Sequence, residues 1–182
     1  LMGVVDELNS AHLECGAFQA VVAGDVPLGA GLSSSAAFEV ATAQCLSDIF
    51  KFRMDKADVA ILCKHAENRF VGMNCGILDQ WSSVHGRKDQ LIFLDCRSLS
   101  GGNYPLGGNV ELVLANTRAP HRLVDGAYNT LREKCFAAAG FFASKKKGVT
   151  HLRDVCGEDL KRWEKKIPSD CLGQARHIIL EN

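Results

Sequence analysis

Residues 24–41 read GDVPLGAGLSSSAAFEVA, and they join a glycine-rich turn to three serines and the start of a helix. Gly29 and Gly31 lack a Cβ atom, so the backbone there can adopt positive φ and approach an anion closely, while Pro27 stiffens the entry. The serines supply caps for the helix, and the remaining free amides at its positive end favour phosphate oxygens. The segment therefore predicts a phosphate-binding loop followed by a helix.

Two familiar phosphate motifs do not account for this loop. A Walker P-loop requires GxxxxGK followed by serine or threonine, and no such Gly-Lys pair occurs in the sequence. A dinucleotide fingerprint requires GxGxxG, whereas residues 29–34 read GAGLSS. The loop is of another type. Taken alone, it fits a capped helix after a tight turn equally well.

The composition is that of an ordinary folded protein with a small-molecule partner. Of the 182 residues, 47% are hydrophobic and 23% are charged. The 21 basic and 21 acidic residues cancel, so the net charge does not point to nucleic acid or to an anionic membrane. The short run Lys145–Lys147 lies beside a glycine, and we interpret it as a solvated turn.

The eight cysteines are scattered without a CxxC pair, so we expect reduced thiols. There is no basic and apolar leader and no run of about 18 apolar residues, which predicts a cytoplasmic protein without a membrane span. The six histidines lack HExxH or paired Cys/His spacing, so we expect them to be structural or exposed rather than metal ligands.

The order of the expected elements favours an α+β fold. Apolar runs bounded by turn residues predict strands over 17–23, 90–96 and 110–116, with the glycine-rich segment 101–108 as the connection between the last two. Apolar residues three and four apart predict helices over 34–50, from about Asp55 to Gly72, from Asp125 to about Phe142, and over 157–166 and 169–181. The second helix has a predicted apolar face of Val59, Leu62, Cys63, Ala66 and Phe70, and the third a predicted apolar stripe of Tyr128, Leu131, Cys135, Ala138 and Phe142. Because helical patterns are already under way at both ends, we expect the chain to be cut from a longer protein.

Two carboxylates in the segment HAENRFVGMNCGILDQWSS, residues 65–83, can converge on one site: we expect Glu67 late on a helix and Asp79 in a glycine-containing loop. Phosphoryl transfer needs a divalent ion across the terminal phosphates and a group that positions or deprotonates the acceptor alcohol. Ser35 and Glu67 can supply the metal ligands and Asp79 the acceptor partner. Spacing alone leaves two simpler roles open: Glu67 as a solvent-exposed helix charge, and Asp79 as the cap of a helix that begins at Gln80.

Four ordered blocks resemble galactokinases, of the GHMP small-molecule kinase superfamily. They are PLGAGLSSSAA at 27–37, ENRFVGMNCGILDQ at 67–80, FLDCRSL at 93–99 and HRLVDGAYN at 121–129. The resemblance implies a GHMP kinase-like two-domain fold, incomplete at both ends. Residues 1–118 then form part of the amino-terminal domain, and residues 119–182 the beginning of the carboxy-terminal one.

The resemblance also implies residue roles. ATP-binding residues would be Gly29, Ala30, Gly31, Leu32, Ser33, Ser34 and Ser35. Ser35 and Glu67 would hold Mg2+, Asp79 would be catalytic and engage the anomeric hydroxyl, and Tyr128 would contact the sugar. The implied reaction is ATP plus D-galactose giving galactose 1-phosphate and ADP, with Asp79 acting as general base or chiefly orienting the hydroxyl.

Departures from the galactokinase pattern leave alternatives open. The family's segments resembling GRVNLIGEHTDY and GGGFGGC do not occur in these residues, and Ala127 stands where glutamate is common. A galacturonate, arabinose or N-acetylgalactosamine kinase, a non-catalytic galactose- and ATP-binding sensor, and a truncated homologue therefore also fit. The complete serine motif, with Glu67 and Asp79, favours the kinase, although we expect the isolated chain to be inactive. Trp81 replaces the usual phenylalanine, which we interpret as packing.

Overall fold

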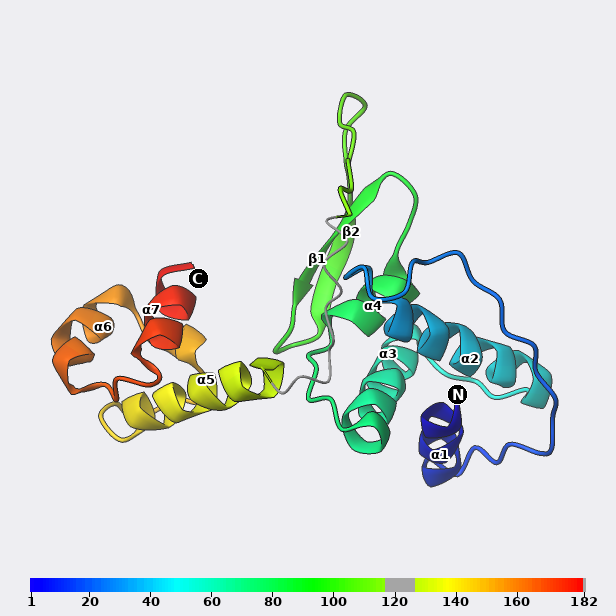
Figure 1. The fold of residues 1–182 in the computed structure, drawn as a ribbon, viewed down its shortest axis with the longest axis horizontal. Helices are drawn as coiled ribbons and strands as arrows, with labels where there is room; N and C mark the ends of the chain where they lie inside the picture. The colour runs from blue at the N-terminus through cyan, green and yellow to red at the C-terminus, as the bar shows by residue number, and fades with distance from the viewer. Residues whose placement is uncertain (117–126, 182) are drawn as a thin grey trace. The chain divides into compact units, whose positions relative to one another are not determined.

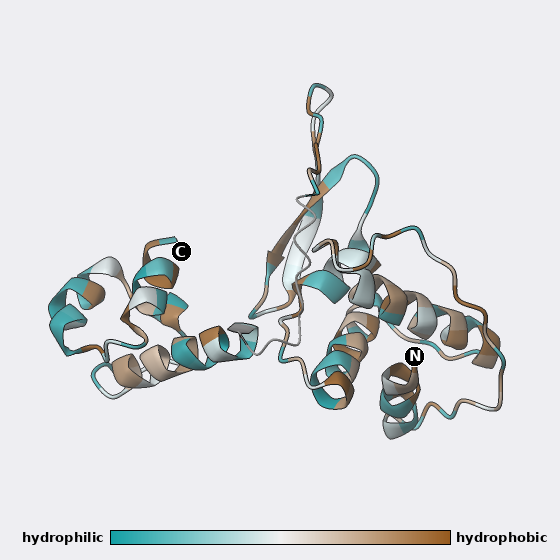
Figure 2. Cartoon of the chain, viewed as in Figure 1, coloured by the Kyte–Doolittle hydropathy of each residue, from teal (hydrophilic) through white to brown (hydrophobic). Residues whose placement is uncertain are grey.

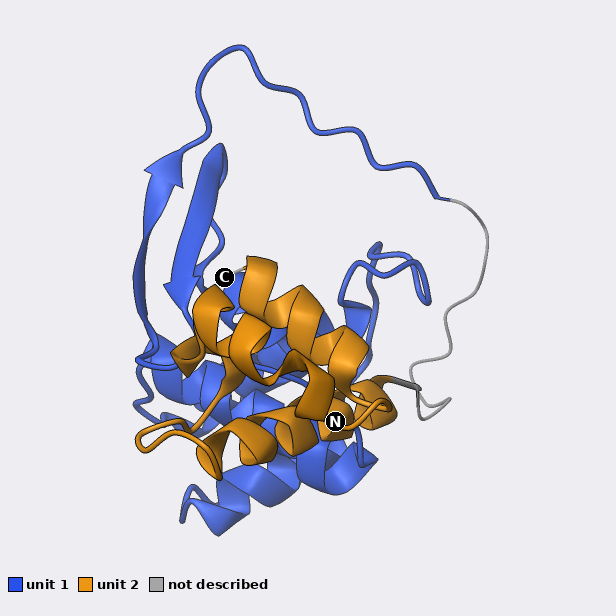
Figure 3. Ribbon diagram, turned by 90° about the vertical axis from the view of Figure 1, so that its left-hand side faces the viewer, with its two compact units in different colours: residues 1–122 blue, residues 123–182 orange. Residues whose placement is uncertain are grey.

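The computed structural model describes residues 1–116 and 127–181, and the chain divides into two compact units, Leu1–Arg122 and Leu123–Asn182 (Figure 3). The first unit contains α1 (Met2–Ser10), α2 (Ser34–Phe50), α3 (Lys56–His65), the π-helical turn η1 (Ala66–Val71), α4 (Leu78–His85), β1 (Gln90–Asp95) and β2 (Ser100–Pro105) (Figure 1). The second contains α5 (Ala127–Ala143), η2 (Leu152–Asp154), α6 (Gly157–Trp163), η3 (Glu164–Lys166) and α7 (Leu172–Glu181). The predicted α+β class is confirmed.

The core of the first unit lies where α1, α2 and α3 meet. Leu8, Ala43 and Cys63 are fully buried there, and Val59 and Leu62 lie on the same predicted apolar face of α3. Burying each large aliphatic side chain contributes roughly 1.5–3 kcal/mol to stability. The last member of the predicted face, Phe70, is exposed instead.

The strands β1 and β2 form an antiparallel hairpin whose inner face rests on α4. Ile92 and Leu94 pack against Trp81 and Ile77, so the packing interpretation of Trp81, which is 8% exposed, is confirmed. The alternate residues of β1 point to the other face of the ribbon and are exposed, as the two-residue period of a strand requires.

The strand predictions were right for one segment of three. β2 lies at Ser100–Pro105, in the stretch predicted as a connection, and it pairs with β1 in register Leu91 to Tyr104. The Asp95 carboxylate accepts hydrogen bonds from the backbone N–H groups of Arg97 and Ser98, at 2.8 and 3.0 Å. These bonds close a short turn, and the turn brings residues 100–105 alongside β1.

The other two predicted strands, residues 17–23 and 110–116, are not paired as strands and have no regular secondary structure. Val21, Leu112 and Val113 are at least 75% exposed. Brown residues in Figure 2 mark this apolar character along both segments. An apolar run becomes a strand only when a second strand satisfies its backbone, and the described residues supply no such partner here.

The second unit is a helical cluster around Phe142, Cys171 and Ala175, which are at most 1% exposed. Its three α-helices confirm the predicted helices of this region. The run Lys145–Lys147 lies in an exposed turn, as predicted, where the Lys146 ammonium pairs with the Asp159 carboxylate. Among the described residues of both units, no helix is long and apolar enough to cross a membrane.

Gly101→Ala should destabilise the hairpin, because a Cβ atom at this position would clash with the backbone carbonyl oxygen of Phe93. We expect a loss of about 1–3 kcal/mol in the free energy of unfolding, as for other overpacked sites, measured by thermal melting. Gly108→Ala is the matched control, since no atom lies within 4 Å of its added Cβ. Equal melting temperatures for the two variants would contradict the prediction.

Candidate active site

The glycine-rich loop before α2 adopts the predicted backbone. Gly29 and Gly31 have φ of +68° and +73°, in the left-handed region that glycine adopts at little cost. Ser33 is the residue before the helix and also has positive φ, +54°, so it does not have the extended backbone that a capping side chain requires. The predicted serine cap is therefore wrong. Its absence leaves the first-turn amides of α2 free of side-chain caps, as an anion site requires.

Ser34 and Ser35 lie on the wall of a cavity of about 920 Å³ in the first unit. The extended segment before the loop runs over α2 and forms the opposite wall (Figure 1). Most of the lining is apolar, including Phe38, Ala41 and Ile49, so the two hydroxyls are among the few polar groups that it contains. Both serines are half-buried.

Glu67 lies at the start of η1, where α3 widens into a π-helical turn that ends at Gly72. Such turns interrupt regular helices frequently at functional sites. The side chain is 5% exposed, so the alternative role as a solvent-exposed charge is wrong. Because a buried carboxylate without partners is costly, its contacts decide how it is held.

The partner of Glu67 is Gln80, whose side chain is completely buried. Its Nε2 donates to Glu67 Oε2 at 2.8 Å and to Glu39 Oε2 at 3.2 Å. The amide thereby joins α2, η1 and α4. Our sequence reasoning missed both Glu39 and Gln80. The available signals were that Glu39 follows Ser35 by one helical turn, and that Gln80 follows Asp79 directly.

Asp79 lies in the first turn of α4 and is exposed. We expected it in a loop, or as the cap of a helix beginning at Gln80, but the residue before the helix is Ile77 and no side chain caps it. Adjacent helical residues point in different directions, so the turn that buries Gln80 presents Asp79 to solvent. The carboxylate is thus accessible to a ligand.

Burial raises the pKa of Glu39 from 4.5 to about 7, with the negative charge of Glu67 adding to the effect and the Gln80 hydrogen bond opposing it. Burial also raises the pKa of the neighbouring thiols, Cys63 to about 12 and Cys75 to about 11. Both thiols therefore stay protonated at neutral pH, and Cys75 donates to Asn68 Oδ1 at 3.2 Å. They fill the space around the carboxylates without reactive chemistry.

The oxygen donors that we expect at the metal site, Ser35 and Glu67, are of the type that Mg2+ prefers, provided that phosphate oxygens complete its coordination. No group of three or more His, Cys, Asp or Glu side chains in the described ranges can hold a metal by itself. Mg2+ in kinases commonly uses one or two protein oxygens together with substrate phosphates. The hydrogen bonds that Glu67 accepts from Gln80 and Cys75 both reach Oε2, and no side chain among the described residues donates to Oε1.

Tyr128 belongs to the second unit, near the start of α5, and is 43% exposed. The apolar stripe predicted for this helix is right at Ala138 and Phe142, which are buried, and wrong at Leu131, which is exposed. The proposed contact of Tyr128 with a sugar stays a prediction. Of the block at 121–129, the residues before Ala127 lie outside the described ranges.

Glu39→Gln should remove a pH dependence from the free energy of unfolding. Because the pKa of Glu39 rises from 4.5 to about 7 on folding, this carboxyl stabilises the fold at low pH, and the contribution is lost as pH rises through 7. We expect the melting temperature of the wild type to fall relative to that of E39Q as pH rises from about 5 to about 8. The fall should be roughly 2–4 °C for each kcal/mol lost from the free energy of unfolding.

His65 contributes a pH dependence of the opposite sign to the free energy of unfolding, because burial lowers its pKa. This contribution is the same in the wild type and in E39Q, so it cancels in the difference between their melting temperatures. Parallel melting profiles for the wild type and E39Q would contradict the prediction.

Comparisons with known proteins agree on one family. Residues 1–87 match the model of the GHMP kinases N terminal domain. The chain is 40% identical over 165 residues to a galactokinase from Mannheimia succiniciproducens and 41% identical to one from Actinobacillus succinogenes. Each alignment covers 89% of this chain and 42% of the relative, so the chain spans about two fifths of their length.

A solved structure, that of Lactococcus lactis galactokinase complexed with galactose, is similar with a TM-score of 0.82 and 26% identity. The similarity covers 99% of this chain and 47% of that protein. The predicted resemblance and fold are thereby confirmed. Residues 1–87 match the GHMP kinase N-terminal domain family, and the chain is similar to galactokinases.

Proposed function

We propose that the protein containing this chain is an ATP-dependent sugar 1-kinase that converts D-galactose to galactose 1-phosphate. The observation that carries the proposal is the buried Gln80 amide, which joins the helix of the serine loop to Glu67 and to the turn of Asp79. These are the parts that phosphoryl transfer requires: an anion site, a carboxylate for a metal and an accessible group for the acceptor. The similarity to galactokinases supports galactose as the acceptor.

The loop from Gly29 to Ser35 would bind the ATP phosphates through its backbone amides, helped by the positive end of α2. Ser35 and Glu67 would hold Mg2+, which neutralises the charge that develops on the terminal phosphates. Two observations support this assignment: Ser35 is half-buried, and Glu67 Oε1 accepts no side-chain hydrogen bond within residues 1–116 and 127–181. Burial of Glu67 strengthens its attraction to a cation, because the surrounding protein screens charge less than water does.

Asp79 would orient the anomeric hydroxyl of the sugar and accept its proton as transfer proceeds. Its exposure on α4 gives a substrate access, and helix geometry fixes its backbone. Positioning and charge stabilisation carry most of the catalysis in phosphoryl transfer, so a strong base is not required. Tyr128 would contribute a further contact with the sugar.

Two wider assignments belong to the same proposal. Residues 1–118 would form part of an amino-terminal GHMP domain, and residues 119–182 the beginning of a carboxy-terminal one. We also place the protein in the cytoplasm, which the eight free cysteines support, since thiols stay reduced in that compartment.

Asp79→Asn in the whole protein should abolish sugar phosphorylation and leave ATP binding near the wild-type value, because the amide keeps the shape but cannot accept a proton. Turnover is measured with galactose and, in parallel, with galacturonate, arabinose and N-acetylgalactosamine. Asp58→Asn is the matched control, an exposed aspartate in the first turn of α3. Retained turnover in D79N would remove Asp79 from the mechanism.

Glu67→Gln should raise the Mg2+ concentration needed for half-maximal rate by about tenfold or more, since it replaces a charged ligand oxygen by a neutral one. The measurement is a magnesium titration of the rate at saturating ATP and sugar. Glu7→Gln makes the same chemical change at another buried carboxylate, one paired with Arg69 outside the candidate site. An unchanged magnesium requirement in E67Q would contradict the metal role.

A further inference from the structure

We propose that Gln80 and Glu39 are positioning residues for magnesium binding. In this role the Gln80 amide donates a hydrogen bond to Glu67 and fixes the carboxylate so that its other oxygen faces the cation. Glu39 accepts a second hydrogen bond from the same amide and so fixes the position of Gln80. The inference rests on the proposed function, because it takes Glu67 as the metal ligand. Neither residue would touch the nucleotide, the sugar or the ion.

The geometry sets the direction of the Glu67 carboxylate. Gln80 Nε2 lies 2.8 Å from Glu67 Oε2, and this hydrogen bond is shorter than the one from the same Nε2 to Glu39. A hydrogen bond to one carboxylate oxygen restricts rotation about the terminal torsion, which is otherwise broad. Outer partners of this kind orient metal ligands in many proteins.

Glu39 determines where the Gln80 amide lies. Its Oε2 accepts from the same Nε2 at 3.2 Å, and its side chain is 7% exposed on α2. Residues four apart on a helix lie on the same face, so Glu39 lies one turn below Ser35. Through Gln80, the Glu67 carboxylate is therefore linked to the helix that carries Ser35, the other proposed metal ligand.

A cost in the structure argues against a role in packing alone. The other polar atom of the amide, Gln80 Oε1, is buried and has no hydrogen-bond partner among the described residues. A buried polar atom without a partner is unfavourable, and an apolar side chain of similar volume would avoid the penalty. An amide at this position is explained if the hydrogen bonds from its NH2 group are needed to orient the two carboxylates.

The test measures ATP binding by calorimetry in the whole protein, with and without Mg2+ and without sugar, so that no turnover is needed. Gln80→Met removes both hydrogen bonds at similar volume, and Glu39→Ala removes the support behind the amide. For both we expect the tightening of ATP binding by Mg2+ to shrink by about tenfold or more. Glu39→Gln keeps an acceptor for the Gln80 amide and should retain most of the tightening.

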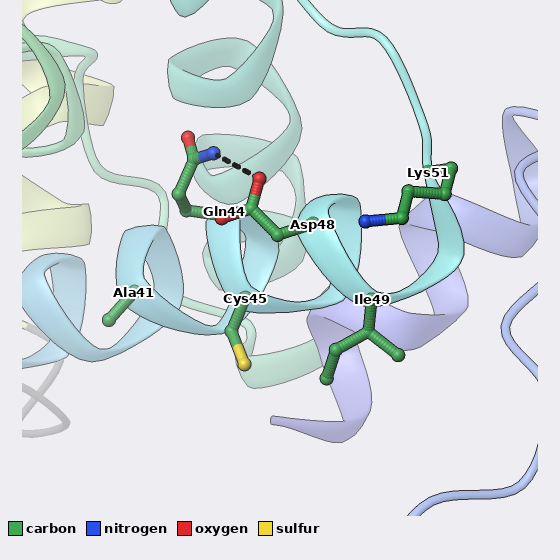
Figure 4. Close-up of a pocket in the computed structure, with 6 residues that line it drawn as sticks. All are labelled: Ala41, Gln44, Cys45, Asp48, Ile49 and Lys51. Carbon is green, nitrogen blue, oxygen red and sulfur yellow. Dashed lines mark hydrogen bonds between the residues drawn. The ribbon is translucent and has the colours of Figure 1, made fainter.

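Gln44→Met is the matched control. Gln44 also lies on α2 and donates its Nε2 to a carboxylate, that of Asp48, at 3.3 Å, but it is exposed on the wall of a surface hollow (Figure 4). The same chemical change there should leave the magnesium effect unaltered. Should Gln80→Met fail to fold, Gln80→Asn replaces it, since asparagine keeps a polar amide but is shorter by one methylene. A reduced tightening of ATP binding by Mg2+ in Q80N supports the positioning role, and an unchanged tightening overturns it.

The outcomes separate this inference from the proposed function. If E67Q loses the magnesium effect while Q80M and E39A keep it, the positioning role is overturned and the metal role of Glu67 stands. If E67Q itself keeps the effect, there is no ligand to position and the inference is also overturned. If the wild type does not phosphorylate galactose but Q80M and E39A still weaken magnesium-dependent ATP binding, the inference stands and the proposed function fails.

Discussion

The hydrogen bonds of the buried Gln80 amide are the interaction on which the candidate site depends. One NH2 group donates to two carboxylates from different elements, Glu39 on α2 and Glu67 on η1, and both side chains are largely buried. Two buried negative charges would repel each other strongly. Burial raises the pKa of Glu39 to about 7, so this carboxyl is close to half protonated at neutral pH and the repulsion falls. A neutral donor is then sufficient to hold the cluster.

Small side chains in the helical core allow that interaction to form. Ala43, Ala60, Cys63 and Ala66 are at most 2% exposed, and they lie where α2, α3 and α4 pack on one another. Small residues let helices approach closely, so a glutamine on α4 can reach a glutamate on α2. The π-helical turn η1 then brings Glu67 to the same point. Packing and polar chemistry therefore depend on each other here: a larger core residue would separate the carboxylates from their donor.

Much of the fold was predictable because it depends on local periodicity. The bounds of α2 and the glycine end of η1 follow from apolar spacing and from Gly72, and the left-handed loop follows from Gly29 and Gly31. The strands were harder. Residues 110–116 have the composition of a strand, but pairing depends on which segment lies alongside, and the turn at Asp95 brings residues 100–105 there first.

The sequence by itself determined the motifs: the serine loop, the two acidic residues Glu67 and Asp79, and their order along the chain. Those are one-dimensional properties, and a resemblance to a family can be recognised from them. Only the tertiary structure decided which of them are buried, and that Glu39 and Gln80 link them. Glu39 and Gln80 are 41 residues apart, and hydrogen bonds at that separation arise from the packing of helices, which no local pattern encodes.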